Sequence, residues 1–149
     1  MSRKLEVFQR CRQVVNQRVE TARTAMENAQ RAANEESKSS AGDKYETGRA
    51  MMQIERDKAA QHMIEGLKLK KVLDEIDLKR PSTHVQLGSL VKTNNGNFFI
   101  AIPAGIIELH GQVYYAISLA SPLGSKLKNC KVGEQVTFNN QSYKITEIL

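Results

Sequence analysis

The residues best suited to chemistry are two acids, Asp43 and Glu46, in the run Gly42-Asp43-Lys44-Tyr45-Glu46. They stand three positions apart at the predicted start of a helix, so their carboxylates would lie on one side of it. Such a pair can share a hard divalent cation such as Mg²⁺, which keeps its remaining waters. Asp at an N-cap followed by Glu at the third helical position is also a variant of the capping box. The spacing therefore leaves a metal site and a plain helix cap open, and the two are compatible.

Other catalytic motifs are missing from the sequence. His62, His84 and His110 have neither the HExxH spacing nor the cysteine partners of a zinc site. Cys11 and Cys130 form no CxxC pair and are interpreted as reduced thiols of a cytosolic protein. The chain also lacks a glycine-rich phosphate loop and a nucleophile elbow. We therefore expect a protein that is not an enzyme by itself.

The acids need an element that carries them, and residues 1–80 are predicted to form it. Alternating steps of three and four give the first helix the apolar stripe of a coiled coil. The stripe consists of Leu5, Phe8, Val15, Val19, Ala22, Met26, Ala29 and Ala33, with Arg12 at the one missing position. A turn is predicted over 37–42, where Gly42 accepts a positive φ.

A second helix is predicted from Lys44 to Leu78. Its apolar face is less regular and is assigned to Met51, Ile54, Ala60, Ile64, Leu67, Val72 and Ile76. Two helices joined by a short turn pack antiparallel, which makes an arm of about 50 Å with its tip near residues 39–46. A compact three- or four-helix bundle is the alternative for this half.

Residues 81–149 have a different character, since they contain all three prolines and six of the nine glycines. Short β-branched and aromatic runs predict strands. These runs are Val85, Leu87, Leu90-Val91, Phe98 to Ile102, Val113 to Leu119, Gln135 to Phe138 and Tyr143 to Ile148. Asn95-Gly96 predicts a type I′ hairpin. Ser121 as N-cap and Pro122 at the first helical position predict one short helix. The expected fold is α+β, a coiled-coil arm over 1–80 and a small antiparallel β domain over 81–149.

Composition restricts the function further. With 40% hydrophobic and 26% charged residues, the chain is neither a disordered tail nor a collagen-like protein. The net charge of +6 is compatible with a polyanionic partner but is not concentrated as in a nucleic-acid footprint. The longest apolar run, residues 98–107, is shorter than the roughly 20 residues of a membrane helix. We expect a cytoplasmic protein without a membrane partner.

The whole chain resembles the Gre-type bacterial transcript cleavage factors, which act on RNA polymerase. The resemblance rests on the coiled coil, on a Gly-Asp-x-x-Glu tip at Gly42, Asp43 and Glu46, and on the C-terminal half. The most similar stretches there are Ile117 to Leu127, Lys131 to Val136 and Tyr143 to Ile148. This resemblance implies that residues 81–149 fold like FK506-binding proteins (FKBP-like).

The resemblance also implies a mode of action and roles for single residues. A monomer would dock at the secondary channel of RNA polymerase through the surface around Ser121 and Pro122, and its coiled coil would reach the active centre. Asp43 and Glu46 would there help to hold a Mg²⁺ shared with the polymerase, rather than a tightly bound cofactor, and promote cleavage of backtracked RNA. Tyr45 and Arg49 are candidates for contacting that RNA.

The sequence departs from the family pattern beside the acids. Thr47-Gly48-Arg49-Ala50 follows Glu46 where the family has Asn-x-Glu-Tyr, and Lys44 replaces the usual Leu. These changes make the tip less acidic and weaken the attraction for Mg²⁺. A secondary-channel regulator without cleavage is therefore the first alternative. An FKBP-like peptidyl-prolyl isomerase or chaperone is the second, and a coiled-coil adaptor the third.

Overall fold

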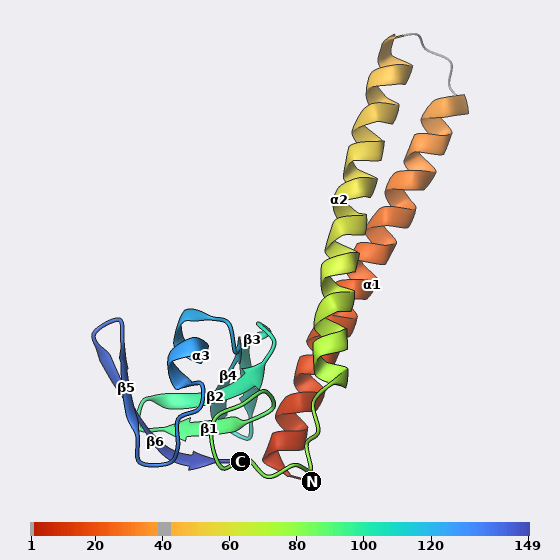
Figure 1. Ribbon diagram of the computed structural model, residues 1–149. Coiled ribbons are helices and arrows are strands. Elements are labelled where there is room, and N and C mark those ends of the chain that lie inside the picture. The colour runs from red at the N-terminus through yellow and green to blue at the C-terminus, as the bar shows by residue number, and fades with distance from the viewer. Residues whose placement is uncertain (1, 39–42) are drawn as a thin grey trace. The chain divides into compact units, whose positions relative to one another are not determined.

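The computed structural model describes residues 2–38 and 43–149, without the side chains of 36–38 and 43–46. The described chain contains two long helices, α1 (Arg3–Lys38) and α2 (Asp43–Asp74), followed by six strands and a short helix, α3 (Pro122–Leu127) (Figure 1). This arrangement confirms the α+β class. Two compact units are present, Val15–Lys70 and Met1–Val14 with Lys71–Leu149. The predicted domain boundary at residue 81 and the FKBP-like assignment stay predictions.

The helical unit, Val15–Lys70, is a hairpin with a narrow seam. On α1 the buried seam residues are Val15, Val19, Ala22, Ala29 and Ala33, which confirms the distal part of the predicted stripe. On α2 the buried residues of this unit are small, Ala59 and Gly66. A Cβ added at Gly66 would lie 2.8 Å from Val19 Cγ2, so a side chain there would push the two helices apart.

The predicted apolar face of α2 is wrong. Met51, Ile54, Ile64 and Leu67 are between 44% and 59% exposed, although each was assigned to the packed face. Small residues fill the seam because they let two helix backbones approach closely. These four apolar side chains are left facing solvent, whereas Leu73, near the end of α2, is buried.

One position of the α1 stripe also differs from the prediction. Cys11 is fully buried, whereas Arg12 is exposed and its Nη2 donates to Asp74 Oδ1 at 3.3 Å. A buried guanidinium would need its own partners, whereas a thiol packs like a small apolar group. Burial raises the pKa of the Cys11 thiol to about 12.

Cys11 is therefore expected to resist alkylation in the folded protein. Because the pKa of the Cys11 thiol is about 12, its thiolate fraction at pH 8 is about one in ten thousand. Alkylation is slow because only the thiolate reacts. Iodoacetamide followed by mass spectrometry should find Cys11 unmodified in buffer and fully modified in guanidinium chloride. In a Cys130→Ser variant, Cys11 is the one remaining cysteine, so all labelling occurs on it. Rapid labelling of Cys11 in buffer would contradict its burial.

The helix ends differ slightly from the predicted ones. The backbone of α1 is helical through Lys38, past residue 37, where the turn was predicted to begin. The predicted turn otherwise lies outside the described residues. The second helix ends at Asp74 rather than Leu78, and two tight turns follow it. In them Glu75 N donates to Val72 O and Ile76 N to Leu73 O.

The six strands form one sheet in the order β3-β4-β2-β1-β6-β5. Their bounds are β1 (Leu90–Thr93), β2 (Gly96–Ala101), β3 (Gly105–Leu109), β4 (Gln112–Ser118), β5 (Gln135–Phe138) and β6 (Gln141–Ile148). The prediction missed β3 and placed a strand at Val85. That residue is buried, and its backbone pairs with Asn129 and Cys130 outside any strand.

The sheet is mixed rather than antiparallel throughout. β4 pairs with β2 in parallel, Asn97 opposite Tyr114, while the remaining pairs are antiparallel. The chain leaves β2, forms β3, and then inserts β4 between β3 and β2. Gly105, with a φ of 81°, begins β3 in a conformation that suits glycine. Strand periodicity carries no information about this order of insertion.

The hairpin turns also differ from the prediction. The β1–β2 hairpin exists, but its loop is Asn94-Asn95, and neither residue has a positive φ. Two positive values in succession occur at Asn139-Asn140, with φ of 50° and 64°, in the β5–β6 hairpin. That is the loop with the type I′ signature.

Helix α3 covers one face of the sheet and confirms the predicted cap. Ser121 Oγ accepts a hydrogen bond from Gly124 N at 3.0 Å, and Pro122 is the first helical residue. Leu123 and Leu127 enter an apolar core made with strand residues. The buried members from the strands and loops are Val85, Val91, Phe98, Ile100, Cys130, Tyr143 and Ile145.

Candidate functional site

The tip is carried by the start of α2. The helix begins at Asp43, so the backbone places Asp43 and Glu46 one turn apart. The side chains of these two acids and of Tyr45 lie outside the described part, so their roles as metal ligands and RNA contacts stay predictions. The N-cap assignment depends on the same undescribed residues. What the structure adds is a helical backbone that suits a shared cation.

Arg49 is the one predicted tip residue whose side chain is described. It is exposed, one turn beyond Glu46 on the same helix. A cation at this distance lowers the negative potential that the two acids would create. Its predicted contact with RNA stays a prediction.

Below the tip, α1 and α2 are joined by a polar bridge. Arg56 Nη1 on α2 donates to Gln30 Oε1 on α1 at 2.8 Å, and Arg56 Nη2 contacts Asp57 Oδ1 at 3.0 Å. This bridge borders a groove of ≈ 660 Å³ that also contains Met26 and Arg31. Arg56 was not predicted as a functional residue, because an arginine on a helix surface gives no sequence signal of a cross-helix contact.

The predicted docking residues lie at the start of α3. Pro122 is exposed, and Ser121 is partly exposed with its hydroxyl fully engaged. Its Oγ donates to Ser118 O at 2.7 Å while it accepts from Gly124 N. These contacts confirm the role of Ser121 as a cap. The role of Ser121 and Pro122 in docking stays a prediction.

An exposed apolar patch that sequence reasoning missed lies on β3 and β4. Ile106 is 68% exposed and stands opposite Tyr115, which is 39% exposed and stacks on Phe98 with ring centroids 5.6 Å apart. Val113 lies two residues before Tyr115 on the same strand face and is 36% exposed. The alternation of β4 was visible in the sequence, but β3 was not predicted, so the pairing was missed.

One contact connects the start of α1 to the β3–β4 hairpin. His110 Nε2 lies 2.7 Å from Glu6 Oε2, and His110 sits in the turn with a φ of 51°. The hydrogen bond with His110 lowers the pKa of the Glu6 carboxyl, against a smaller opposing effect of burial. The sequence gives no signal for this contact, since the two residues are far apart in the chain.

The described residues contain neither a metal-binding cluster nor a membrane-spanning helix. Within residues 2–38 and 43–149, the described side chains include no group of three or more His, Cys, Asp or Glu that could hold a metal ion. The side chains of Asp43 and Glu46 are not among the described ones. No helix of the described chain is both long and apolar enough to cross a membrane.

These features define an α+β protein with a long helical hairpin and a mixed sheet. No family model matches the sequence, and no curated protein matches it. Among solved structures, the chain is similar to one described as the structure of the transcription factor Gfh1. The TM-score is 0.35 and the identity 18%, over 95% of this chain and 92% of that one. At this TM-score and sequence identity, no function is inferred for this chain from that protein.

Proposed function

We propose that this chain is a transcription elongation factor that binds bacterial RNA polymerase. It acts as a cytoplasmic monomer, inserts its helical hairpin into the secondary channel, and stimulates the polymerase's own cleavage of backtracked RNA. The chain is not an enzyme in isolation. Its partners are the polymerase and the backtracked RNA of the elongation complex.

The observation that carries this proposal is the hairpin itself. The shorter of its helices, α2, has 32 residues and therefore a length of about 48 Å. Its seam includes Ala22, Ala29 and Ala33 on α1 and Ala59 and Gly66 on α2, so the paired helices stay thin. A long and thin rod with acids at its turn suits a task inside a narrow channel.

The chemistry is assigned to Asp43 and Glu46. Carboxylate oxygens are ligands that Mg²⁺ accepts, and a helix that begins at Asp43 spaces the two acids by one turn. A Mg²⁺ at this place would supply activation of water for hydrolysis. The two residues would orient and retain the ion beside the polymerase's own acids, while Tyr45 and Arg49 would contact the RNA.

Docking is assigned to the surface around Ser121 and Pro122. Pro122 is exposed at the first turn of α3, whose buried leucines anchor it to the core. A rigid, exposed helix start is a suitable docking element, because little conformational freedom is lost when it binds.

A second candidate is a regulator that occupies the same channel without stimulating cleavage. It is favoured by Lys44 and Arg49, two basic residues within three positions of an acid in the sequence, of which Arg49 is exposed. A peptidyl-prolyl isomerase is less well supported. Such a site needs aromatic side chains in a concave pocket, whereas Phe98, Phe99 and Tyr114 are buried in the core.

The test is binding to core RNA polymerase followed by an RNA cleavage assay. We expect the full chain to co-elute with core polymerase in gel filtration at low salt and to accelerate cleavage in stalled, backtracked complexes. Failure to bind would contradict both polymerase hypotheses. Binding without accelerated cleavage would favour the non-cleaving regulator. A proline-containing peptide assay, in which no rate increase over buffer is expected, removes the isomerase.

A further inference from the structure

The outer side of α2 carries an apolar stripe, made of Ala60, Ile64 and Leu67. Ile64 and Leu67 are 45% and 44% exposed, and Ala60 is half-buried. The three residues follow each other at steps of four and three, so they lie on one side of the helix. Ala60 and Leu67 each come one position after a seam residue, Ala59 or Gly66, which turns the stripe by about 100° from the seam. The α2 stripe is therefore a surface that the pairing with α1 leaves open.

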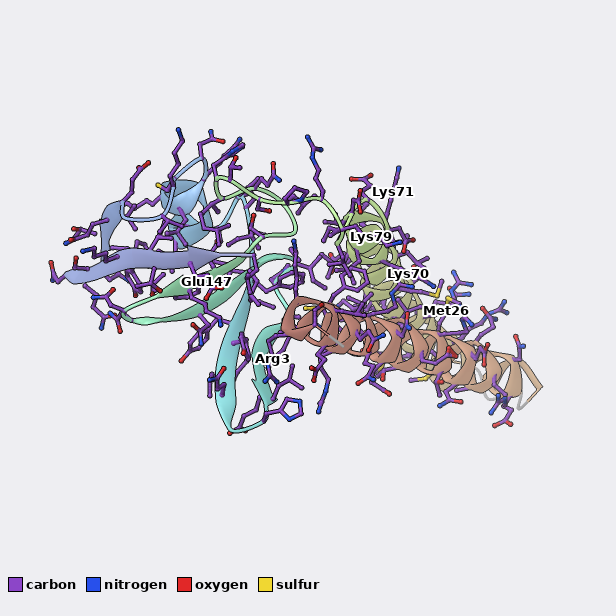
Figure 2. The ribbon with its side chains drawn as sticks, turned by 90° about the horizontal axis from the view of Figure 1, so that it is seen from below. Arg3, Met26, Lys70, Lys71, Lys79 and Glu147 are labelled. Atoms are coloured by element: carbon purple, nitrogen blue, oxygen red, sulfur yellow. The ribbon has the colours of Figure 1, made fainter. Side chains whose placement is uncertain are left out.

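Opposite charges stand at equal distances on the two sides of this stripe. Asp57 lies seven residues before Ile64 and Lys71 lies seven residues after it, which is about two helical turns each way. A step of seven returns a side chain to nearly the same face, so both charges continue the line of the stripe. The Asp57 side chain is 69% exposed although Arg56 contacts it, and Lys71, labelled on α2 in Figure 2, is exposed as well. The surface thus has an acidic end, an apolar centre and a basic end.

A surface with this order of charges is complementary to its own reversed copy. When two α2 helices lie antiparallel about Ile64, Asp57 of each chain faces Lys71 of the other, and the two Ile64 side chains meet. Leu67 then lies opposite Ala60 of the second copy, so a large side chain packs against a small one. A parallel arrangement would instead place Asp57 beside Asp57 and Lys71 beside Lys71, which repel. Charge and side-chain size therefore favour an antiparallel contact between two copies of this chain.

We propose that two copies of the chain associate through the α2 stripe, antiparallel and centred on Ile64. Both copies use the same surface, so the assembly closes as a dimer. The contact consists of a few apolar side chains with a charge pair at each end, and interfaces of this small size are weak and transient. The proposed function belongs to the monomer. The dimer is a second state, formed at high concentration, in which the outer side of α2 is covered.

The test is sedimentation equilibrium of the full chain at concentrations between about 1 µM and 1 mM. We expect the weight-average mass to rise from that of one chain toward that of two, and to rise less at high salt, which screens the charge pairs. Ile64→Asp places two like charges at the centre of the contact and should raise the dissociation constant of the dimer by about tenfold or more. Because Ile64 is exposed, this variant should fold like the parent.

A charge swap tests the antiparallel direction. Asp57→Lys should raise the dissociation constant by about tenfold, because a lysine then faces Lys71 at each end of the contact. Adding Lys71→Asp to the same chain should restore the parent value, since opposite charges face each other again. The matched control is Glu55→Lys, which changes the net charge by the same amount on the opposite side of α2 from Ile64. It should leave the dissociation constant nearly unchanged.

Several results would overturn this proposal. One is a chain that stays monomeric at about 1 mM or forms species larger than a dimer. Another is association that Ile64→Asp leaves unchanged, which would place the contact elsewhere. A double variant as weak as Asp57→Lys alone would exclude the antiparallel contact. At the micromolar concentrations of an RNA cleavage assay the chain is expected to be monomeric, so failure of the dimer and failure of the proposed function are distinguishable.

Discussion

Replacing Gly124 with alanine should destabilise the protein by about 3 kcal/mol or more, an unusually large effect for a single added methyl group. The new Cβ would lie 2.1 Å from the carbonyl oxygen of Ser118 and 2.7 Å from Ser121 Oγ. The first of these neighbours is backbone, so α3 itself must move. That movement would break the Ser121 cap and withdraw Leu123 and Leu127 from the core.

Two further variants separate the causes of this loss. Ser121→Ala removes the cap alone and should cost about 1 kcal/mol. Ser125→Ala changes an exposed position of the same helix and should stay within about 0.5 kcal/mol of the parent. Urea unfolding followed by circular dichroism measures all three free energies. A Gly124→Ala variant as stable as Ser125→Ala would show that α3 can shift without loss.

Asp43→Asn should reduce the stimulated cleavage of backtracked RNA by about tenfold or more while the chain still binds polymerase. Asparagine is about as good an N-cap as aspartate, so the start of α2 should keep its stability. It lacks the negative charge that a Mg²⁺ ligand supplies. The measurement compares cleavage rates of stalled complexes at saturating factor, with thermal unfolding recorded on the same preparations.

The control for this change is Asp57→Asn, which removes an exposed carboxylate of the same helix that pairs with Arg56. It should leave cleavage unchanged, since Asp57 lies about four turns from Asp43. Asp43→Ala should lose both cleavage and about 1 kcal/mol of stability. If Asp43→Asn cleaves as fast as the parent, the acid is a helix cap only, and Lys44 and Arg49 become the residues to change next.

Helical periodicity predicted the existence and the pairing of α1 and α2 but not the packed face of α2. The apolar pattern selected Met51, Ile54 and Ile64, which are exposed, whereas the seam is made by residues such as Ala59 and Gly66. Hydrophobicity alone does not identify the packed face of α2, because two helix backbones approach closely only where the side chains between them are small. The same reasoning explains why Cys11 is buried and Arg12 is not.

In the C-terminal half, the capping signal of the short helix was reliable, whereas the type I′ turn predicted at Asn95-Gly96 was wrong. Ser121-Pro122 predicted α3 correctly, since capping depends on residues that are neighbours in the chain. The insertion of β4 beside β2 depends on pairing between separate segments, which periodicity cannot reveal. The contact between His110 and Glu6 was missed for the same reason, because the two residues are far apart in the chain. Of the candidate site, the sequence predicted the cap of Ser121, which is confirmed, and the roles of Asp43 and Glu46, which stay predictions.

The gradual change from valine to alanine along the seam has a consequence for how the hairpin opens. Val15 and Val19 each bury more apolar surface than Ala22, Ala29 or Ala33, and burial stabilises in proportion to that surface. The free energy of local opening therefore falls along α1 toward Ala33. Amide hydrogens will exchange with solvent fastest at that end, because the two helices begin to separate there. The helical turns around Val15 will stay closed until global unfolding.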